Sequence, residues 1–101
     1  MDKPVPTLSI ITVCYNAAPY ITATLESAFT QSFQDFELII VDGKSSDNTL
    51  VLLKPFQSKI SLIVSEKDHG IYDAMNKGVA LARGEWIYFL NAGDAFYHAG
   101  D

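Results

Sequence analysis

The sequence predicts an α/β fold, a Rossmann-like open parallel β-sheet with helices on its faces. Four short apolar runs alternate along the chain with segments whose apolar residues recur at helical spacing. The first run, Leu8–Cys14, is rich in β-branched residues and apolar on both faces, which is typical of a buried parallel strand. Chains that alternate in this way form a parallel sheet with right-handed crossovers, so we expect the order β-α-β-α-β-α-β.

The four apolar runs are the expected strands. They comprise Leu8–Cys14, Phe36–Asp42, Ile60–Val64 and Trp86–Leu90. The first expected helix starts near Pro19, because proline suits the first turn of a helix. Its amphipathic stripe consists of Ile21, Leu25, Ala28 and Phe29.

Two further helices are expected between the later strands. After the second strand, Ser46 or Asp47 is the expected N-cap of a short helix that ends before Pro55. Its apolar residues are Leu50, Val51 and Leu53. The third helix follows the polar segment SEKDHG, and Gly84 is its expected C′ residue. One side of this helix carries Ile71, Ala74, Met75, Gly78, Val79 and Ala82.

The composition indicates one domain, residues 1–101, that can bury a core. Hydrophobic residues make up 49% of the 101 positions. The net charge of −5 argues against a basic face for nucleic acid, so we expect no nucleic-acid partner. The one cysteine, Cys14, lies in an apolar run and predicts a buried structural thiol. Neither a signal peptide nor a membrane span is recognisable, so we expect a cytoplasmic location, with peripheral contact to the inner face of the membrane left open.

Polar side chains follow each of the four expected strands. They are Tyr15 and Asn16; Asp42 and Lys44; Ser65, Glu66 and Asp68; and Asn91 and Asp94. In open α/β sheets, ligands bind outside the carboxyl ends of the strands, so this edge is the expected site. Ordinary loop polarity is a sufficient explanation for Glu66, Lys67 and Asp68. It is a weaker one for Asp42, since a carboxylate directly behind ELIIV starts partly buried.

The residues at this edge narrow the class of ligand. No G-x-G-x-x-G segment, P-loop or zinc-spaced Cys/His cluster is present. The edge is rich in Asp and Asn, which suits an oxygen-ligated Mg²⁺ or Mn²⁺ that leaves positions for phosphate and water. Asp73, Asn76 and Lys77 share one side of the third helix, and a solvated face explains them as well as a ligand face does.

Four segments together resemble family 2 glycosyltransferases with the GT-A fold, most closely bacterial enzymes of exopolysaccharide, capsule or O-antigen synthesis. The segments are LSIITVCYNAAPYI, FELIIVDGKSSDNT, EKDHGIYDAMNKGVALARGEW and IYFLNAGDAF. They occur in the family's order and spacing and cover roughly residues 6 to 97. The chain therefore looks like the nucleotide-sugar-binding half of such an enzyme.

The resemblance implies a strand order of 3-2-1-4 and a set of site residues. Asp94, in NAGD, matches the last aspartate of the family's D-x-D motif, which ligates Mn²⁺ or Mg²⁺ at the sugar diphosphate. Asp42 matches the aspartate of the V-D-D-G-S block, which contacts the nucleotide base. The remaining expected nucleotide-binding residues are Val13, Tyr15, Asn16, Asp73 and Asn91.

The chain also departs from the family pattern. Asn91 and Gly93 stand where many members have aspartate, Met75 where many have an arginine, and Val13 where proline is common. The catalytic base and the acceptor-binding half of the family follow the D-x-D motif. We therefore expect the base beyond Asp101, and we expect this chain to be an N-terminal fragment that is inactive alone and prone to self-association.

The implied activity is inverting transfer of a sugar from a nucleoside-diphosphate donor, expected to be a UDP-sugar, to a saccharide or lipid-linked acceptor in cell-surface polysaccharide synthesis. Two alternatives stay open. One is a non-catalytic nucleotide-binding module. The other is a nucleotidyltransferase, although that class usually carries a Gly-rich basic loop where this chain has YNAAPY.

Overall fold

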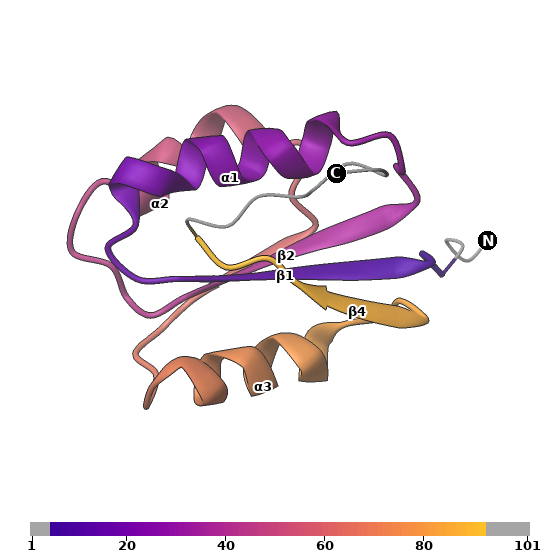
Figure 1. Ribbon diagram of the computed structural model, residues 1–101. Helices are drawn as coiled ribbons and strands as arrows, with labels where there is room; N and C mark the ends of the chain where they lie inside the picture. The colour runs from indigo at the N-terminus through magenta and orange to yellow at the C-terminus, as the bar shows by residue number, and fades with distance from the viewer. Residues whose placement is uncertain (1–4, 93–101) are drawn as a thin grey trace.

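The computed structural model describes residues 5–92 and confirms the predicted α/β architecture (Figure 1). The strands are β1 (Leu8–Cys14), β2 (Phe36–Asp42), β3 (Leu62–Ser65) and β4 (Trp86–Phe89). They form one parallel sheet in the order β3-β2-β1-β4, as the resemblance implies. The helices are α1 (Ala18–Thr30), α2 (Thr49–Leu52) and α3 (Ile71–Leu81), and a 3₁₀ turn, η1, covers Lys54–Phe56.

Helices cover both faces of the sheet, with α1 and α2 on one side and α3 on the other (Figure 1). Alternate residues of β1 therefore enter two different cores. Ile10 packs with Ile21 and Leu25 of α1, whereas Ile11 packs with Ala74 of α3. The two central strands are thus buried on both faces, which explains why most of their residues are apolar.

Helix α3 lies close to β1 because small residues face the sheet. A Cβ added at Gly78 would lie 2.4 Å from Cγ2 of Ile11, so glycine is required at this contact. The expected apolar stripe of this helix is only partly buried, since Ile71 is 49% and Val79 42% exposed. The buried side is made by Ala74 and Gly78. The side of α3 that faces the sheet is therefore the one whose small residues let the helix backbone approach β1, not the one with the largest apolar side chains.

Several expected boundaries shift by a few residues. Strand β3 begins at Leu62 rather than Ile60, because the Ile60 N–H donates to the Phe56 carbonyl at the end of η1. Strand β4 ends at Phe89, one residue before Leu90. The N-cap of α2 is Asn48, not Ser46 or Asp47.

Gly84 does not cap α3, which ends at Leu81 with Ala82 as its C-cap. A Cβ at Gly84 would lie 2.7 Å from the backbone nitrogen of Ser9. The glycine therefore allows the chain to pass close to β1 just before β4 begins. The prediction that Gly84 is the C′ residue of α3 was wrong. Glycine is favoured both where a helix ends and where two backbone segments lie close together, so the sequence does not distinguish the two cases.

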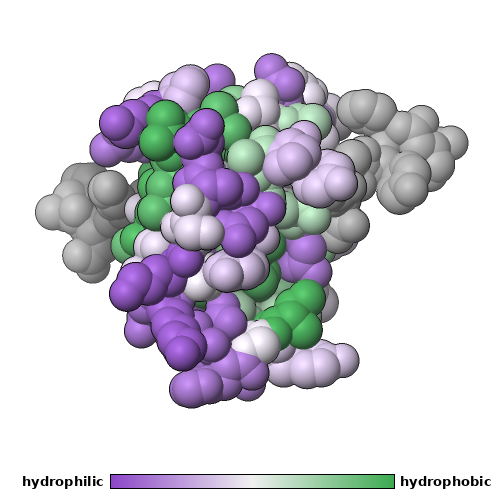
Figure 2. Space-filling model, turned by 90° about the vertical axis from the view of Figure 1, so that its left-hand side faces the viewer, coloured by the Kyte–Doolittle hydropathy of each residue, from purple (hydrophilic) through white to green (hydrophobic). Residues whose placement is uncertain are grey.

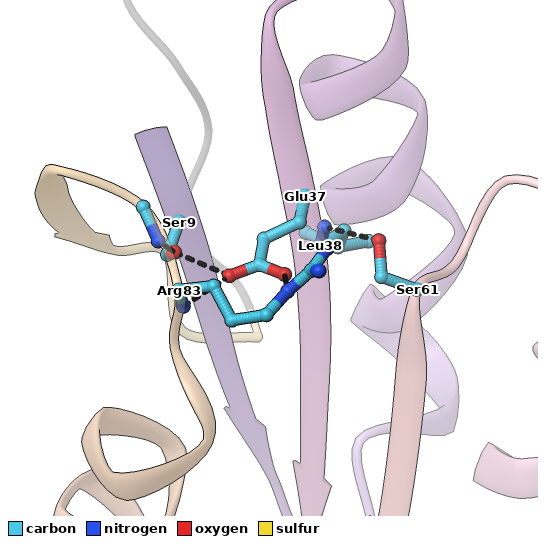
Figure 3. Close-up of polar contacts among 6 residues, drawn as sticks. Ser9, Glu37, Leu38, Ser61 and Arg83 are labelled. Carbon is cyan, nitrogen blue, oxygen red and sulfur yellow. Dashed lines mark hydrogen bonds and ion pairs between the residues drawn. The ribbon is translucent and has the colours of Figure 1, made fainter. Parts of the chain in front are cut away.

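A buried carboxylate joins three segments at the amino end of the sheet (Figure 3). Glu37 Oε2 accepts hydrogen bonds from Ser9 Oγ at 2.6 Å and from the Arg83 N–H at 2.7 Å, and Glu37 is 6% exposed. Its Oε1 accepts from Arg83 Nε at 3.3 Å. Burial alone would raise the pKa of Glu37, but these hydrogen bonds and the Arg83 charge hold that pKa below its ordinary value of 4.5. The carboxylate thus fastens the segment before β4 to β1 and β2.

Strand β4 lies at one edge of the sheet and, within residues 5–92, pairs with β1 alone. Its side chains are unusually open for a strand, since Trp86 is 69% and Ile87 41% exposed. Self-association through this surface remains a prediction.

Candidate functional site

The carboxyl ends of the strands lie together on the left of Figure 1. Figure 2 views the molecule from that side and shows hydrophilic residues spread across the surface between apolar patches. The loops after β1, β2 and β3 and the described residues after β4, as far as Ala92, all lie at this edge, as the parallel topology requires.

Two neighbouring cavities open at this edge. The first, of about 310 Å³, is lined by Tyr15, Gly43, Lys44, Lys67 and Asp68. The second, of about 350 Å³, is lined by Val13, Cys14, Tyr15, Asn16, Ala17, Tyr20, Asp68, Ile71, Asn91 and Ala92. Tyr15 and Asp68 line both cavities, so the two hollows adjoin one another across the ends of the central strands.

The structure brings four of the expected site residues together in the second cavity. Val13, Tyr15 and Asn16 arrive from the end of β1, and Asn91 arrives just after β4. Tyr15 is 63% exposed, which leaves its ring available to a planar ligand. The strand order explains this convergence, since β1 and β4 are neighbours although nearly the whole chain separates them.

Asp42, by contrast, faces the protein interior. It is 0% exposed, and both of its carboxylate oxygens are occupied. Oδ2 accepts hydrogen bonds from the Ser45 N–H at 2.9 Å and Ser65 Oγ at 2.8 Å. Oδ1 accepts from Ser45 Oγ at 2.5 Å and Cys14 Sγ at 3.4 Å. These contacts make Asp42 a cap of the turn after β2, and its expected contact with a nucleotide base stays a prediction without an exposed carboxylate to support it.

The Asp42 carboxylate also affects its thiol neighbour. Burial raises the pKa of the Cys14 thiol, and the negative charge of Asp42 raises it further. Cys14 is 3% exposed, which confirms the predicted structural thiol.

Asn16 connects the loop after β1 to the loop after β2. Its φ of 49° lies in the left-handed region, which asparagine tolerates well. Its Oδ1 accepts hydrogen bonds from the N–H groups of Ser46 at 2.8 Å and Asp47 at 3.3 Å. In return, its own N–H donates to Ser45 Oγ at 2.8 Å. Asn16 therefore shapes the wall of the site as well as lining it.

Asp73 lines neither cavity and instead stabilises the loop after β3. Its Oδ2 accepts a hydrogen bond from the His69 N–H at 2.9 Å and lies 3.6 Å from Lys77 Nζ. The hydrogen bond from His69 and the charge of Lys77 hold the pKa of Asp73 below its usual range. Its expected contact with nucleotide stays a prediction without a cavity contact to support it.

Asp68 was explained from the sequence by ordinary loop polarity and was not among the expected nucleotide-binding residues. It lies in a polar loop, where a carboxylate needs no functional explanation, yet it is half-buried and lines both cavities. One signal in the sequence was available, namely the glycine at position 43, which leaves space at the end of β2.

The expected metal ligand, Asp94, lies outside the described residues. Within residues 5–92, no three His, Cys, Asp or Glu side chains are grouped so that they could hold a metal ion. Asn91 and Ala92, the last described residues, line the second cavity, and the metal site at Asp94 stays a prediction. In the described part of the chain, no helix combines the length and apolar character of a membrane span.

Residues 9–99 match the family model described as "Glycosyl transferase family 2". The chain is 43% identical over 97 residues to a PGL/p-HBAD biosynthesis glycosyltransferase of Mycobacterium tuberculosis, an alignment that covers 93% of this chain and 38% of the relative. It is 36% identical over 92 residues to the putative teichuronic acid biosynthesis glycosyltransferase TuaG of Bacillus subtilis, covering 88% of this chain and 36% of TuaG. The chain thus spans little more than a third of the length of these relatives.

Two solved structures share the fold. Residues 1–349 of TarS from S. aureus, in complex with UDP-GlcNAc, superpose with a TM-score of 0.78 at 30% identity, covering 84% of this chain and 26% of that one. The mannosyltransferase PcManGT from Pyrobaculum calidifontis, in complex with GDP-Man and Mn²⁺, superposes with a TM-score of 0.74 at 27% identity, covering 81% and 26%.

Proposed function

Because the chain belongs to glycosyl transferase family 2, a family of GT-A transferases, we propose that it forms the nucleotide-sugar-binding part of an inverting glycosyltransferase. The observation that carries this proposal is the pair of adjoining cavities at the carboxyl ends of β1 and β2, both of them lined by Tyr15. The nucleotide base lies against the Tyr15 ring, and the diphosphate extends toward Asn91. Complexes of similar proteins with UDP-GlcNAc and with GDP-Man support this class of ligand.

The proposed transfer breaks one bond and forms another at the anomeric carbon of the donor sugar. An acceptor hydroxyl attacks from the face opposite the nucleotide, the bond to the diphosphate oxygen breaks, and a general base outside residues 5–92 takes the hydroxyl proton. A Mg²⁺ or Mn²⁺ held by Asp94 would stabilise the charge that develops on the leaving diphosphate. Asn91, at the wall of the second cavity, orients this end of the donor.

We further propose a UDP-sugar as donor and a saccharide or lipid-linked acceptor in cell-surface glycan synthesis. The name of TuaG, which refers to teichuronic acid biosynthesis, supports the biosynthetic role. Action in the cytoplasm, at or near the inner face of the membrane, is part of the same proposal.

Calorimetric titration of UDP, with Mn²⁺ or with EDTA, tests this function. We expect EDTA to weaken UDP binding at least tenfold, because the metal links the diphosphate to Asp94. Asp94→Asn should abolish the difference between the two conditions. Glu85→Gln is the matched control, since it removes one exposed carboxylate elsewhere and should leave the difference intact.

Two results would count against the proposal in separable ways. Absence of binding to both UDP and GDP would overturn the nucleotide-binding function. UDP binding of equal strength with and without metal would overturn only the role of Asp94.

A further inference from the structure

The location of Asp42 leaves a chemical gap in the proposed site. Selection of uracil needs a hydrogen-bond acceptor aimed at its N3–H group, and an ionised carboxylate is the strongest acceptor that a protein offers. Asp42 is 0% exposed, and its oxygens already accept from Ser45, Ser65 and Cys14. If the chain prefers uracil, another acceptor must face the base.

Asp68 has the location and the free acceptor that this role requires. It lines the first cavity together with Tyr15. Its Oδ1 accepts a hydrogen bond from the Gly70 N–H at 3.1 Å, which holds the carboxylate in a defined orientation. Its Oδ2 has no hydrogen-bond or ion-pair partner among residues 5–92.

Gly43 makes this position of Asp68 possible. A Cβ on residue 43 would lie 2.8 Å from Asp68 Oδ2 and 3.4 Å from Cδ1 of the Tyr15 ring. The carboxylate therefore occupies the space that any side chain at the end of β2 would fill. Glycine at position 43 and aspartate at position 68 are complementary, and the acceptor reaches the cavity from the loop after β3 instead of from β2.

The loop that carries Asp68 is held at both ends. On one side, the Glu66 N–H donates to the Asp42 carbonyl at 3.0 Å. On the other, Asp73 Oδ2 accepts from the His69 N–H at 2.9 Å. Between them, Lys77 Nζ donates to the Lys67 carbonyl at 3.1 Å. Because the loop is anchored, the Asp68 acceptor is already held in place before a ligand binds. This lowers the conformational entropy that the loop loses on binding.

The cavity that Asp68 lines also carries positive charges. Lys44 and Lys67 line it, so the cavity combines one carboxylate acceptor with two lysines. The edge of uracil presents the inverse pattern, a donor N–H between two carbonyl acceptors. Cytosine has an unprotonated ring nitrogen at this place and would meet the carboxylate lone pair to lone pair. Guanine has the N–H, but an amino group replaces one of the flanking carbonyls and would face a lysine.

We propose, on the basis of the proposed function, that Asp68 is the residue that selects uracil in the donor nucleotide. Gly43 makes room for its carboxylate, Tyr15 supplies the stacking surface, and Asp42 supports the site from within. The prediction that Asp42 contacts the base is replaced by an indirect, structural role for that residue.

The test compares the binding of UDP, CDP and GDP to the wild-type chain and to Asp68→Asn by calorimetry with Mn²⁺. The readout is the ratio of the CDP to the UDP dissociation constant, because loss of a negative charge near a diphosphate should strengthen binding of every nucleotide alike. We expect the wild type to prefer UDP over CDP at least tenfold, the size of one hydrogen bond to a charged group. In Asp68→Asn this ratio should fall at least tenfold, since the amide can turn its NH₂ group toward the cytosine nitrogen.

Two further variants distinguish the effect of the Asp68 acceptor from that of the net charge. Asp35→Asn makes the same chemical change at an exposed position at the opposite end of the sheet, and it should keep the wild-type ratio. Gly43→Ala keeps the charge but displaces the Asp68 carboxylate, and it should lower the ratio. Circular dichroism confirms the fold of each variant before titration.

The outcomes distinguish this inference from the function on which it rests. A wild-type chain that binds no nucleoside diphosphate overturns the proposed function. A wild type that binds UDP and CDP equally, or an Asp68→Asn variant that keeps the wild-type preference, overturns the role of Asp68 and leaves nucleotide binding intact.

Discussion

Replacing Asp42 by asparagine should damage the fold rather than the choice of base. The buried carboxylate accepts hydrogen bonds from the Ser45 N–H, the Ser45 and Ser65 hydroxyls and the Cys14 thiol. An asparagine keeps one oxygen and turns an NH₂ group toward donors that need an acceptor. Hydrogen bonds to a charged group contribute about 1.5–3 kcal/mol each, and losing an acceptor leaves buried donors unpaired. We expect Asp42→Asn to lower the free energy of unfolding by about 3 kcal/mol, a large share of the 5–15 kcal/mol typical of a domain.

Urea unfolding followed by circular dichroism measures this loss, with Asp68→Asn as the matched comparison. Both variants make the same chemical change, but Asp68 is half-buried at a cavity and should cost less than about 0.5 kcal/mol. The reasoning is refuted if Asp42→Asn unfolds at the wild-type urea concentration yet loses its preference for UDP. That result would indicate that Asp42, and not Asp68, contacts the nucleotide base.

Two further predictions concern the interior of the sheet. Glu37→Gln should cost about 2 kcal/mol at pH 7. The pKa of Glu37 is lowered in the folded state. The contribution of its charge to the free energy of unfolding is therefore complete above pH 4.5, the ordinary pKa, and is lost as the pH falls through the folded pKa. The urea midpoints of the wild type and of Glu37→Gln should therefore converge as the pH falls below 4.5, and a constant gap would contradict the role of the charge. Thr12 is 0% exposed, and its Oγ1 has no partner within residues 5–92, so Thr12→Val should raise the free energy of unfolding by about 1 kcal/mol. Thr24→Val is its control and should bring no gain, because the Thr24 hydroxyl donates to the Tyr20 carbonyl at 3.0 Å.

The strands were the most predictable part of this protein. Strands β1 and β2 match their predicted bounds residue for residue, because burial on both faces favours a run of mostly apolar residues that contrasts with the polar segments around it. The bounds of short edge strands are harder to predict from the sequence. Strand β3 is exposed along most of its length, and its start depends on where η1 ends, a detail that hydrogen bonds decide and hydrophobicity does not.

The site was predictable in position but not in the role of each residue. Parallel topology alone places Tyr15 and Asn91 at one edge. The environment of Asp42, however, depends on Ser65, which follows 23 residues later and shows no pattern that would mark it as a partner. For Asp68 the sequence contains one sign, Gly43, but its meaning depends on the space beside that glycine, which only the structure shows.

Hydrogen bonds at and around Asn16 hold the loop after β1 and the loop after β2 together. Asn16 supplies the acceptor for two N–H groups of the loop after β2, while Thr49 Oγ1 accepts from the Ala17 N–H at 2.8 Å and Asp47 Oδ2 from the Ala18 N–H at 3.2 Å. Each loop therefore completes the hydrogen bonding of the other. Anyone who exchanges donor specificity between relatives by loop grafting must transplant both segments as a pair, since a graft of either one alone would break this interlock.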